Sequence, residues 1–366
     1  MAALVEGGSD NPMSDQRMTT GASANGALAT DPKAPGAPGG AEPPILFEAR
    51  DLVKHFRTRR HVVQAVNGVS LKIPRGRTVG LVGESGSGKS TVARLALRLL
   101  DPTSGEVHFD GIDLMKASRT EMRALRRRMQ MVFQNPLGSL NPRMRVVNAV
   151  GEPLVVHGIA KGRELVDRVA RLLERVGLGA GDLYKFSHQF SGGQAQRIGI
   201  ARALATDPDL IVCDEAVSAL DVSVQAQVLN LLKRLQAELG LSYLFIAHDL
   251  NVVRYMADEV CVMYLGQVVE RGDGDELFRD PHHPYTQMLV SAVPEFAPER
   301  SEKKVRVAPR GEPASPSNPP PGCRFHPRCP KAMPRCSKEA PATHRIAPGR
   351  TVACHLFDPA GEASGR

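Results

Sequence analysis

Residues 83–90 read Gly-Glu-Ser-Gly-Ser-Gly-Lys-Ser, a glycine-rich stretch suited to binding phosphate groups. A glycine-rich loop that opens a helix curls without Cβ clashes, so several backbone N–H groups converge on one anion. Lys89 would reach the outer phosphates of a nucleotide, and the Ser90 hydroxyl would bind Mg²⁺. The predicted phosphate-binding residues are Gly83, Glu84, Ser85, Gly86, Ser87, Gly88, Lys89, Ser90 and Thr91.

Two successive carboxylates, Asp214 and Glu215, follow the apolar residues 210–213. Asp214 would hold Mg²⁺ through water, and Glu215 would polarise the water that attacks the outer phosphate. An acidic turn after a buried strand explains this pair equally well when it is taken alone. Beside Lys89 the pair favours nucleotide hydrolysis, and the two motifs together are compatible with a kinase, a GTPase or a helicase.

A third motif, Phe190-Ser-Gly-Gly-Gln194, lies shortly before the two carboxylates. A Ser-Gly-Gly turn that opens a helix is a second anion site, because its N–H groups and the helix dipole favour negative charge. Here the sequence resembles the ATP-binding subunits of ABC transporters, whose signature is Leu-Ser-Gly-Gly-Gln; Phe190 replaces the leucine. The resemblance implies that Ser191, Gly192, Gly193 and Gln194 contact ATP.

The resemblance extends to four further positions. It implies that Gln134 links Mg²⁺ and the attacking water to the transmembrane subunits, and that Asp221 lies in a loop that contacts the opposite nucleotide site. His248 would contact the γ-phosphate and position Glu215, and Phe56 would stack on adenine. The residues implied in catalysis are Glu215, His248 and Lys89, and those implied in Mg²⁺ binding are Ser90, Gln134 and Asp214.

Each motif occurs once, so the resemblance implies that two ATP molecules are sandwiched between this chain and a second ATPase subunit, identical or paralogous. It also implies two transmembrane permease subunits, an extracytoplasmic substrate-binding protein, and a peripheral place on the cytoplasmic face of the cell membrane. The formal charge of +8 is spread among 39 acidic residues and indicates no nucleic-acid partner.

Four stretches, residues 136–142, 215–223, 283–286 and 291–294, look like the oligopeptide and dipeptide uptake branch of this family. The predicted function is therefore ATP hydrolysis that energises peptide import. Two alternatives stay open: a soluble ABC-type ATPase acting on nucleic acid or ribosomes, and an importer subunit for another substrate such as nickel.

Four cysteines, Cys323, Cys329, Cys336 and Cys354, crowd into 32 residues near the C-terminus. In a chain without secretory features such a group favours a metal over disulfides. The spacing lacks close Cys-x2-Cys pairs and does not identify the metal. The resemblance implies an extension that holds a [4Fe–4S] cluster; structural zinc, or thiols without a metal, remain alternatives.

Composition and hydrophobic patterning divide the 366 residues into three parts. Residues 1–44 are rich in Gly, Ala, Pro and Ser and are expected to be a disordered tail. Residues 45–294 have an α/β pattern, and the resemblance implies an ATPase domain of the P-loop class with a RecA-like core sheet and an inserted helical subdomain at about residues 136–200. Residues 295–366 would form the cysteine-containing extension.

Periodicity predicts the elements that position these motifs. The expected strands cover residues 62–63, 69–73, 78–82, 210–213 and 243–247. The expected helices run from the phosphate loop to about residue 99, over residues 165–176, and over residues 228–239.

Overall fold

The computed structural model describes residues 43–57, 61–292 and 314–359, and the first strand of this described part begins at Ile45. The predicted disordered tail therefore lies outside the described residues apart from its last two. The strands are β1 (Ile45–Arg57), β2 (Val62–Pro74), β3 (Thr78–Val82), β4 (Ser104–Phe109), β5 (Ile112–Asp113), β6 (Met129–Val132), β7 (Leu210–Asp214), β8 (Ser242–Ile246), β9 (Glu259–Tyr264), β10 (Gln267–Asp273), β11 (Thr343–Ala347) and β12 (Arg350–Ala353).

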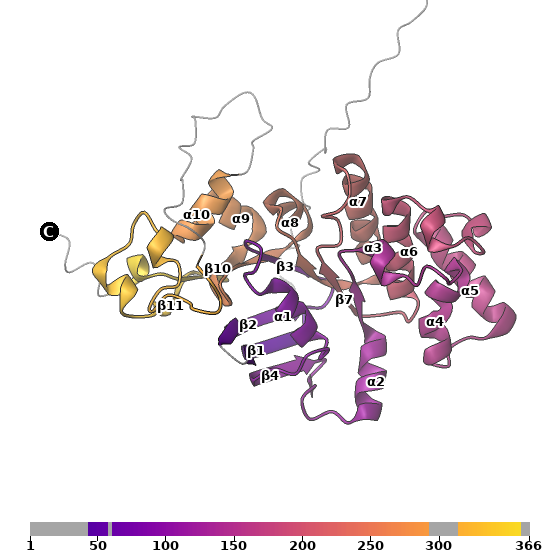
Figure 1. The fold of residues 1–366 in the computed structure, drawn as a ribbon, viewed down its shortest axis with the longest axis horizontal. Helices are drawn as coiled ribbons and strands as arrows, with labels where there is room; N and C mark the ends of the chain where they lie inside the picture. Colours follow the sequence, from indigo (N-terminus) through magenta and orange to yellow (C-terminus); the bar gives the residue numbers. More distant parts are fainter. Residues whose placement is uncertain (1–42, 58–60, 293–313, 360–366) are drawn as a thin grey trace, which may run out of the picture. The chain divides into compact units, whose positions relative to one another are not determined.

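The helices confirm the α/β class. They are α1 (Lys89–Ala96), α2 (Arg119–Arg128), α3 (Pro136–Ser139), α4 (Val146–Val156), α5 (Gly162–Arg175), α6 (Gly192–Leu204), α7 (Val222–Leu239), α8 (Leu250–Met256), α9 (Gly274–Arg279) and α10 (Pro284–Ser291). In Figure 1, α3 to α6 gather on one side of the phosphate loop, whereas β11 lies near α10 on the other.

An eight-stranded sheet runs in the order β11-β12-β10-β9-β3-β8-β7-β6. Strands β9, β3, β8, β7 and β6 are mutually parallel, so the carboxyl ends of β6, β7 and β8 meet at one edge. A second, antiparallel sheet has the order β2-β1-β4-β5. The two strands predicted at residues 62–63 and 69–73 are one strand, β2, because it pairs with β1 along its whole length.

The central strands are buried on both faces, which explains their continuous apolar sequences. On β8, Tyr243 and Phe245 point into one hydrophobic core, shared with α4 to α7. Leu244 and Ile246 point into the other core, shared with α1 and the antiparallel sheet. Successive side chains of a strand alternate between faces, so β8 joins the two cores.

The helix ends near the predicted site follow capping chemistry. Ser191 caps α6 and accepts a hydrogen bond from Gln194 N (3.3 Å), while the Gln194 side chain accepts one from Ser191 N (3.0 Å). Asp221 caps α7 and accepts from Val224 N at 3.0 Å. Such caps, of which the one at Ser191 is reciprocal, satisfy N–H groups that a helix cannot bond internally. Both helices therefore begin at positions that the sequence specifies.

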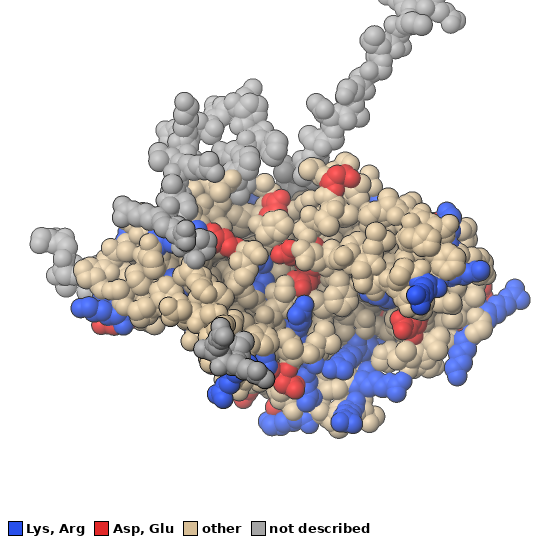
Figure 2. Space-filling view, in the orientation of Figure 1, with Lys and Arg blue, Asp and Glu red and all other residues tan. Residues whose placement is uncertain are grey.

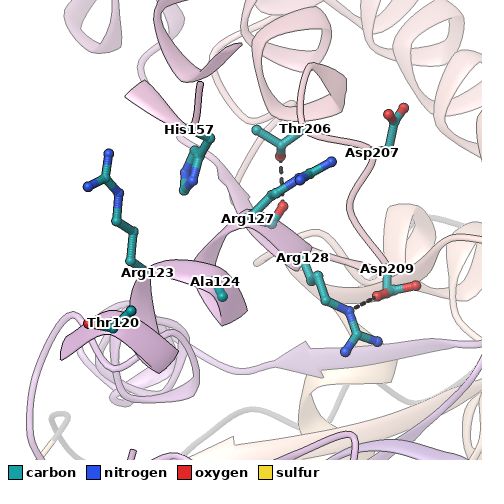
Figure 3. Close-up of a pocket in the computed structure, with 9 residues that line it drawn as sticks. All are labelled: Thr120, Arg123, Ala124, Arg127, Arg128, His157, Thr206, Asp207 and Asp209. Atoms are coloured by element: carbon teal, nitrogen blue, oxygen red, sulfur yellow. Dashed lines mark hydrogen bonds and ion pairs between the residues drawn. The ribbon is translucent and has the colours of Figure 1, made fainter. Parts of the chain in front are cut away.

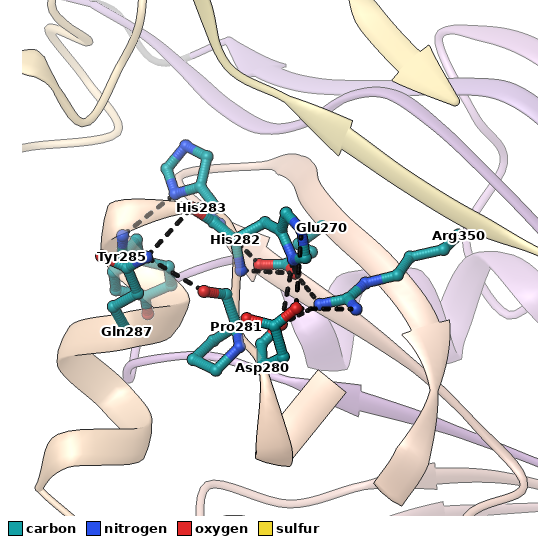
Figure 4. Close-up of polar contacts among 8 residues, drawn as sticks. All are labelled: Glu270, Asp280, Pro281, His282, His283, Tyr285, Gln287 and Arg350. Atoms are coloured by element: carbon teal, nitrogen blue, oxygen red, sulfur yellow. Dashed lines mark hydrogen bonds and ion pairs between the residues drawn. The ribbon is translucent and has the colours of Figure 1, made fainter. Parts of the chain in front are cut away.

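The C-terminal region joins the main sheet, because β12 pairs antiparallel with β10. The fully buried carboxylate of Glu270 on β10 accepts hydrogen bonds from the backbone N–H groups of His282 (2.9 Å) and His283 (2.8 Å). Arg350 of β12 reaches the same carboxylate at 3.3 Å and also donates to the carbonyl of Asp280 (Figure 4). A buried ion pair thus fixes β12 against the sheet.

Within the described part of the chain, none of the helices combines the length and the apolar character needed to cross a membrane. Basic side chains gather on the lower part of the view in Figure 2, where α2 lies. The α2 sequence Arg-Thr-Glu-Met-Arg-Ala-Leu-Arg-Arg-Arg contributes arginine side chains to this region.

Candidate functional site

The predicted phosphate loop connects β3 to α1. A Cβ on Gly83 would lie 2.1 Å from the carbonyl oxygen of Met263, and one on Gly88 would lie 2.1 Å from that of Ala65. Gly88 also has φ 102°, in the left-handed region. The N-cap residue of α1 is Gly88, which has no side chain of its own to cap the helix. Two of the glycines are therefore required by close backbone contacts, and the N-terminal turn of the helix can receive an anion.

Lys89 is buried beneath the loop, and its ammonium donates to the carbonyls of Gly83 (2.7 Å) and Glu84 (2.9 Å). Burial lowers the pKa of Lys89, while the carboxylates of Glu215, Asp214 and Glu84 act in the opposite direction. The ammonium is thus held at the loop by backbone carbonyls, in the place where a nucleotide phosphate would compete for it.

Asp214 ends β7 beside α1, and its Oδ1 accepts a hydrogen bond from Ser90 Oγ at 3.0 Å. Burial raises the pKa of the Asp214 carboxyl, and the hydrogen bond from Ser90 lowers it in part. A hydroxyl and a carboxylate at this distance offer two of the oxygen ligands that Mg²⁺ prefers.

Three predicted residues meet at the carboxyl ends of neighbouring strands. Oε2 of Glu215 accepts a hydrogen bond from Gln134 Nε2 at 2.7 Å and lies 3.6 Å from Nδ1 of His248. Gln134 follows β6, Glu215 follows β7 and His248 follows β8. Glu215 has φ 50°, a conformation rare for residues with a side chain, and its N–H donates to the carbonyl of Ile246 at 2.9 Å. The arrangement places one carboxylate between an amide and an imidazole.

The Ser191–Gln194 turn and Asp221 form a second group. A Cβ on Gly193 would lie 2.2 Å from Cγ1 of Val224, in the first turn of α7. A Cβ on Gly192 would only make an ordinary van der Waals contact with Leu220, at 3.6 Å. No hydrogen bond or ion pair between described residues links this group to the phosphate loop. We call the Ser191–Gln194 turn together with Asp221 the predicted second half-site.

Phe56 lies on β1, partly exposed, with the Lys54 ammonium 5.3 Å from its ring centroid. It pairs with Val63 of β2, two residues before Ala65, whose carbonyl faces Gly88. The predicted adenine-stacking residue therefore lies on the strand pair that borders the phosphate loop.

Comparison with known proteins decides the family. The ABC transporter family pattern matches residues 66–218, and the pattern of the oligopeptide/dipeptide transporter C-terminal region matches residues 269–336. A putative oligopeptide transport ATP-binding protein of Bacillus subtilis is 51% identical over 85% of this chain and 95% of its own length. The chain belongs to the ATP-binding proteins of ABC transporters.

Other relatives agree with this assignment. A putative peptide import ATP-binding protein of Brucella ovis is 49% identical over 84% of this chain and 97% of its own length. Among solved structures, a dimeric ATP-binding cassette in a post-hydrolysis state, bound to ADP and Pi, has a TM-score of 0.58 and 31% identity. That match covers 62% of this chain and 98% of the other.

Two residues that the sequence analysis missed contact the phosphate loop of this ABC protein. The Tyr285 hydroxyl accepts a hydrogen bond from Glu84 N at 2.8 Å, and Arg328 forms two hydrogen bonds to the Glu84 carboxylate. Tyr285 lies in the His-Pro-Tyr-Thr stretch that marked the peptide branch, so a signal was present for it. Arg328 lies 244 positions from Glu84, and no local pattern indicates the contact.

The four C-terminal cysteines line one small cavity. Burial raises the pKa of Cys323 to about 11 and that of Cys354 to about 12, so these two thiols are protonated at neutral pH. Among residues 43–57, 61–292 and 314–359, no group of three or more His, Cys, Asp or Glu side chains is arranged to hold a metal ion. The four cysteines that the sequence singles out thus line the same cavity.

A larger cavity of about 600 Å³ lies apart from the ATP motifs, against α2 (Figure 3). It is lined by Thr120, Arg123, Ala124, Arg127, Arg128, His157, Thr206, Asp207 and Asp209. Arg128 donates to Asp209 at 2.5 Å. Burial lowers the pKa of His157, and the charges of Arg123 and Arg127 lower it further. Arginine therefore supplies the positive charge of this cavity.

Proposed function

We propose that this protein hydrolyses ATP to energise the import of oligopeptides or dipeptides through a membrane ABC transporter. The observation that carries the catalytic part is the position of Glu215 between Gln134 and His248, next to the Ser90–Asp214 pair. The peptide specificity is supported by the C-terminal region match and by relatives whose names refer to peptide transport.

Each site residue has a proposed role. Lys89 and the loop from Gly83 to Thr91 bind the β- and γ-phosphates. Ser90, Gln134 and Asp214 bind Mg²⁺, which supplies charge stabilisation when it is present. Glu215 accepts a proton from the attacking water, and His248 positions Glu215 and contacts the γ-phosphate. Phe56 stacks on the adenine ring.

The second half-site acts on the nucleotide of a second ATPase subunit, which is identical or a paralogue. Ser191, Gly192, Gly193, Gln194 and Asp221 would close over the phosphate loop of that partner. The dimeric state of the related cassette bound to ADP and Pi supports the arrangement.

The transporter would also contain two permease subunits and an extracytoplasmic binding protein, with this subunit peripheral on the cytoplasmic face of the membrane. Residues 136–142, directly after Gln134, would contribute to the surface that docks a permease. We divide the chain into an ATPase domain at residues 45–294, with its helical subdomain at about residues 136–200, and an extension at residues 295–366.

The four cysteines of the extension are proposed ligands of a [4Fe–4S] cluster or, alternatively, of zinc. The donor set fits both, because each is held by cysteine thiolates, and all four thiols line one cavity. Binding would release the thiol protons and draw the sulfur atoms together. Anaerobic purification with a visible absorption spectrum and metal analysis distinguishes the two, and protein without iron or zinc would contradict both. Cys336→Ser should lose the metal.

Uptake assays test the proposed substrate class. Cells that carry the intact transporter should accumulate labelled peptide, and cells with Lys89→Ala should not, because ATP binding is lost. Glu238→Gln, an exposed carboxylate on α7, is the matched control and should leave uptake unchanged. Uptake of nickel instead of peptide, or copurification with nucleic acid rather than two permeases, would support the alternatives and contradict the peptide assignment.

A further inference from the structure

The segment between Cys323 and Cys329 lies directly against the phosphate loop. Nη1 of Arg328 is 2.7 Å from Oε2 of Glu84, and Nη2 is 3.0 Å from Oε1. The Arg328 side chain is 5% exposed and that of Glu84 is 31% exposed. A planar guanidinium that binds both carboxylate oxygens fixes orientation as well as distance. The cysteine-containing extension therefore forms a bidentate ion pair with the ATP site.

The same segment holds the loop at two further points. Phe325 packs against Tyr264 and Tyr285, with ring centroids 5.2 and 5.3 Å away, and the Tyr285 hydroxyl accepts from Glu84 N.

Arg324 donates to the carbonyl of Leu265. The next residue, Gly266, donates from its N–H to the carbonyl of Ser87 at 2.8 Å. Residues 324, 325 and 328 thus support the phosphate loop at both Glu84 and Ser87.

The charge of Glu84 makes its partner important. Glu84 stands in a loop that would bind a triphosphate, and an unpaired carboxylate there would repel the ligand. Arg328 neutralises that carboxylate, and because its own side chain is almost fully buried, water cannot easily replace Glu84 as its partner. Removing the Arg328 side chain would leave an unpaired negative charge on the phosphate loop. It would also remove this contact between the loop and the extension.

Arg328 lies between Cys323 and Cys329 in the sequence, so its guanidinium is connected to any metal that these cysteines bind. Arg328 immediately precedes Cys329 and ends the 3₁₀ turn His326–Arg328. Cys323 N donates to the carbonyl of Cys336 at 2.8 Å, so the turn is also tied to the other cysteines. A change in the spacing of the thiols would move the guanidinium relative to Glu84.

We propose that Arg328 is a positioning residue for ATP binding, which neutralises Glu84 and couples the four-cysteine extension to the phosphate loop. This proposal rests on the proposed ATP site. It assigns a role to the extension in nucleotide affinity, in addition to any role in holding a metal.

Calorimetric titration of the full-length protein with ATPγS tests the proposal. Arg328→Gln should raise the Kd about tenfold, because Glu84 is left unpaired beside the phosphates. Adding Glu84→Gln to that variant should return the Kd to within about threefold of the wild-type value, because the repelling charge is gone. A purely structural loss would not be rescued in this way.

Arg345→Gln is the matched control, because Arg345 is an exposed arginine on β11 of the same extension. It should bind ATPγS as the wild type does. If Arg328→Gln does not fold, Arg328→Lys is the second variant, because it keeps the positive charge but loses the planar guanidinium that binds both carboxylate oxygens. It should raise the Kd for ATPγS about threefold, and adding Glu84→Gln should reverse this increase.

An unchanged Kd in a folded Arg328 variant, or a double variant as weak as the single one, would overturn the proposal. Failure of the wild type to bind ATPγS would instead contradict the proposed ATP site itself.

Discussion

The side-chain amide of Gln134 donates to the carboxylate of Glu215 over 2.7 Å, joining the end of β6 to the end of β7. The bond holds the carboxylate on the side of His248, 3.6 Å away. Glu215 can therefore be directed toward a water by its neighbours before a nucleotide arrives, and each neighbour can be tested separately.

Gln134→Ala should slow ATP hydrolysis more than it weakens ATP binding. The carboxylate loses one of the two groups that orient it, so we expect kcat to fall about tenfold. Steady-state kinetics beside equilibrium binding of ATPγS measures the two effects. A variant with normal kcat would show that the Gln134–Glu215 hydrogen bond has no role in hydrolysis.

Gly193→Ala should destabilise the protein, because the added Cβ would lie 2.2 Å from Cγ1 of Val224. We expect the free energy of unfolding to fall by about 1–3 kcal/mol, the usual cost of overpacking. Gly199→Ala on the same helix is the control, since a Cβ there meets no atom within 4 Å. It should be neutral or stabilising by up to about 1 kcal/mol.

Adding Val224→Ala to Gly193→Ala should restore most of the lost stability, measured by urea unfolding. If the double variant is no more stable than Gly193→Ala alone, the contact between α6 and α7 is not the cause.

These contacts show which parts of the site were accessible from the sequence. The phosphate loop and the two carboxylates at the end of β7 are local motifs, and the parallel order of the strands brings the strand ends together. The contacts of Glu84 were not accessible, although the stretch that holds Tyr285 was singled out, because Tyr285 and Arg328 lie 201 and 244 positions away. Strands β11 and β12 were also missed, since their polar residues give no apolar run, and β12 is fixed by the distant Glu270.

Arg350→Leu should destabilise the junction between β12 and the main sheet. It leaves the fully buried Glu270 carboxylate without its cationic partner, which costs about 3–5 kcal/mol for a broken buried pair. Urea unfolding measures the loss, and Arg345→Leu on the neighbouring strand should change stability by less than about 0.5 kcal/mol. Equal effects of the two substitutions would argue against the ion pair.

His283 should make stability depend on pH. Burial lowers the pKa of His283 from 6.5 to about 3, so the folded protein keeps it neutral where the unfolded chain binds a proton. Between those pH values the unfolded state binds more protons. The contribution of His283 to the free energy of unfolding is therefore fully present above pH 6.5. It decreases by up to about 1.4 kcal/mol per pH unit as the pH falls from 6.5 toward 3.

His283→Asn isolates this contribution, because asparagine can still cap α10, as the His283 ring does by accepting from Tyr285 N at 3.0 Å. Urea unfolding at pH 7, 6 and 5 should show a shallower decrease for the variant. Parallel curves for the two proteins would show that His283 does not titrate on unfolding.

The most direct test of the account is ATP turnover by Glu215→Gln, measured together with ATP binding on the same preparation. Glutamine keeps the shape of the side chain and its contact with Gln134 but cannot accept a proton from water. The account predicts ATP binding close to that of the wild type, hydrolysis reduced at least about a hundredfold, and a closed dimer that persists with ATP. Turnover at the wild-type rate would contradict the assignment of Glu215 and, with it, the proposed mechanism.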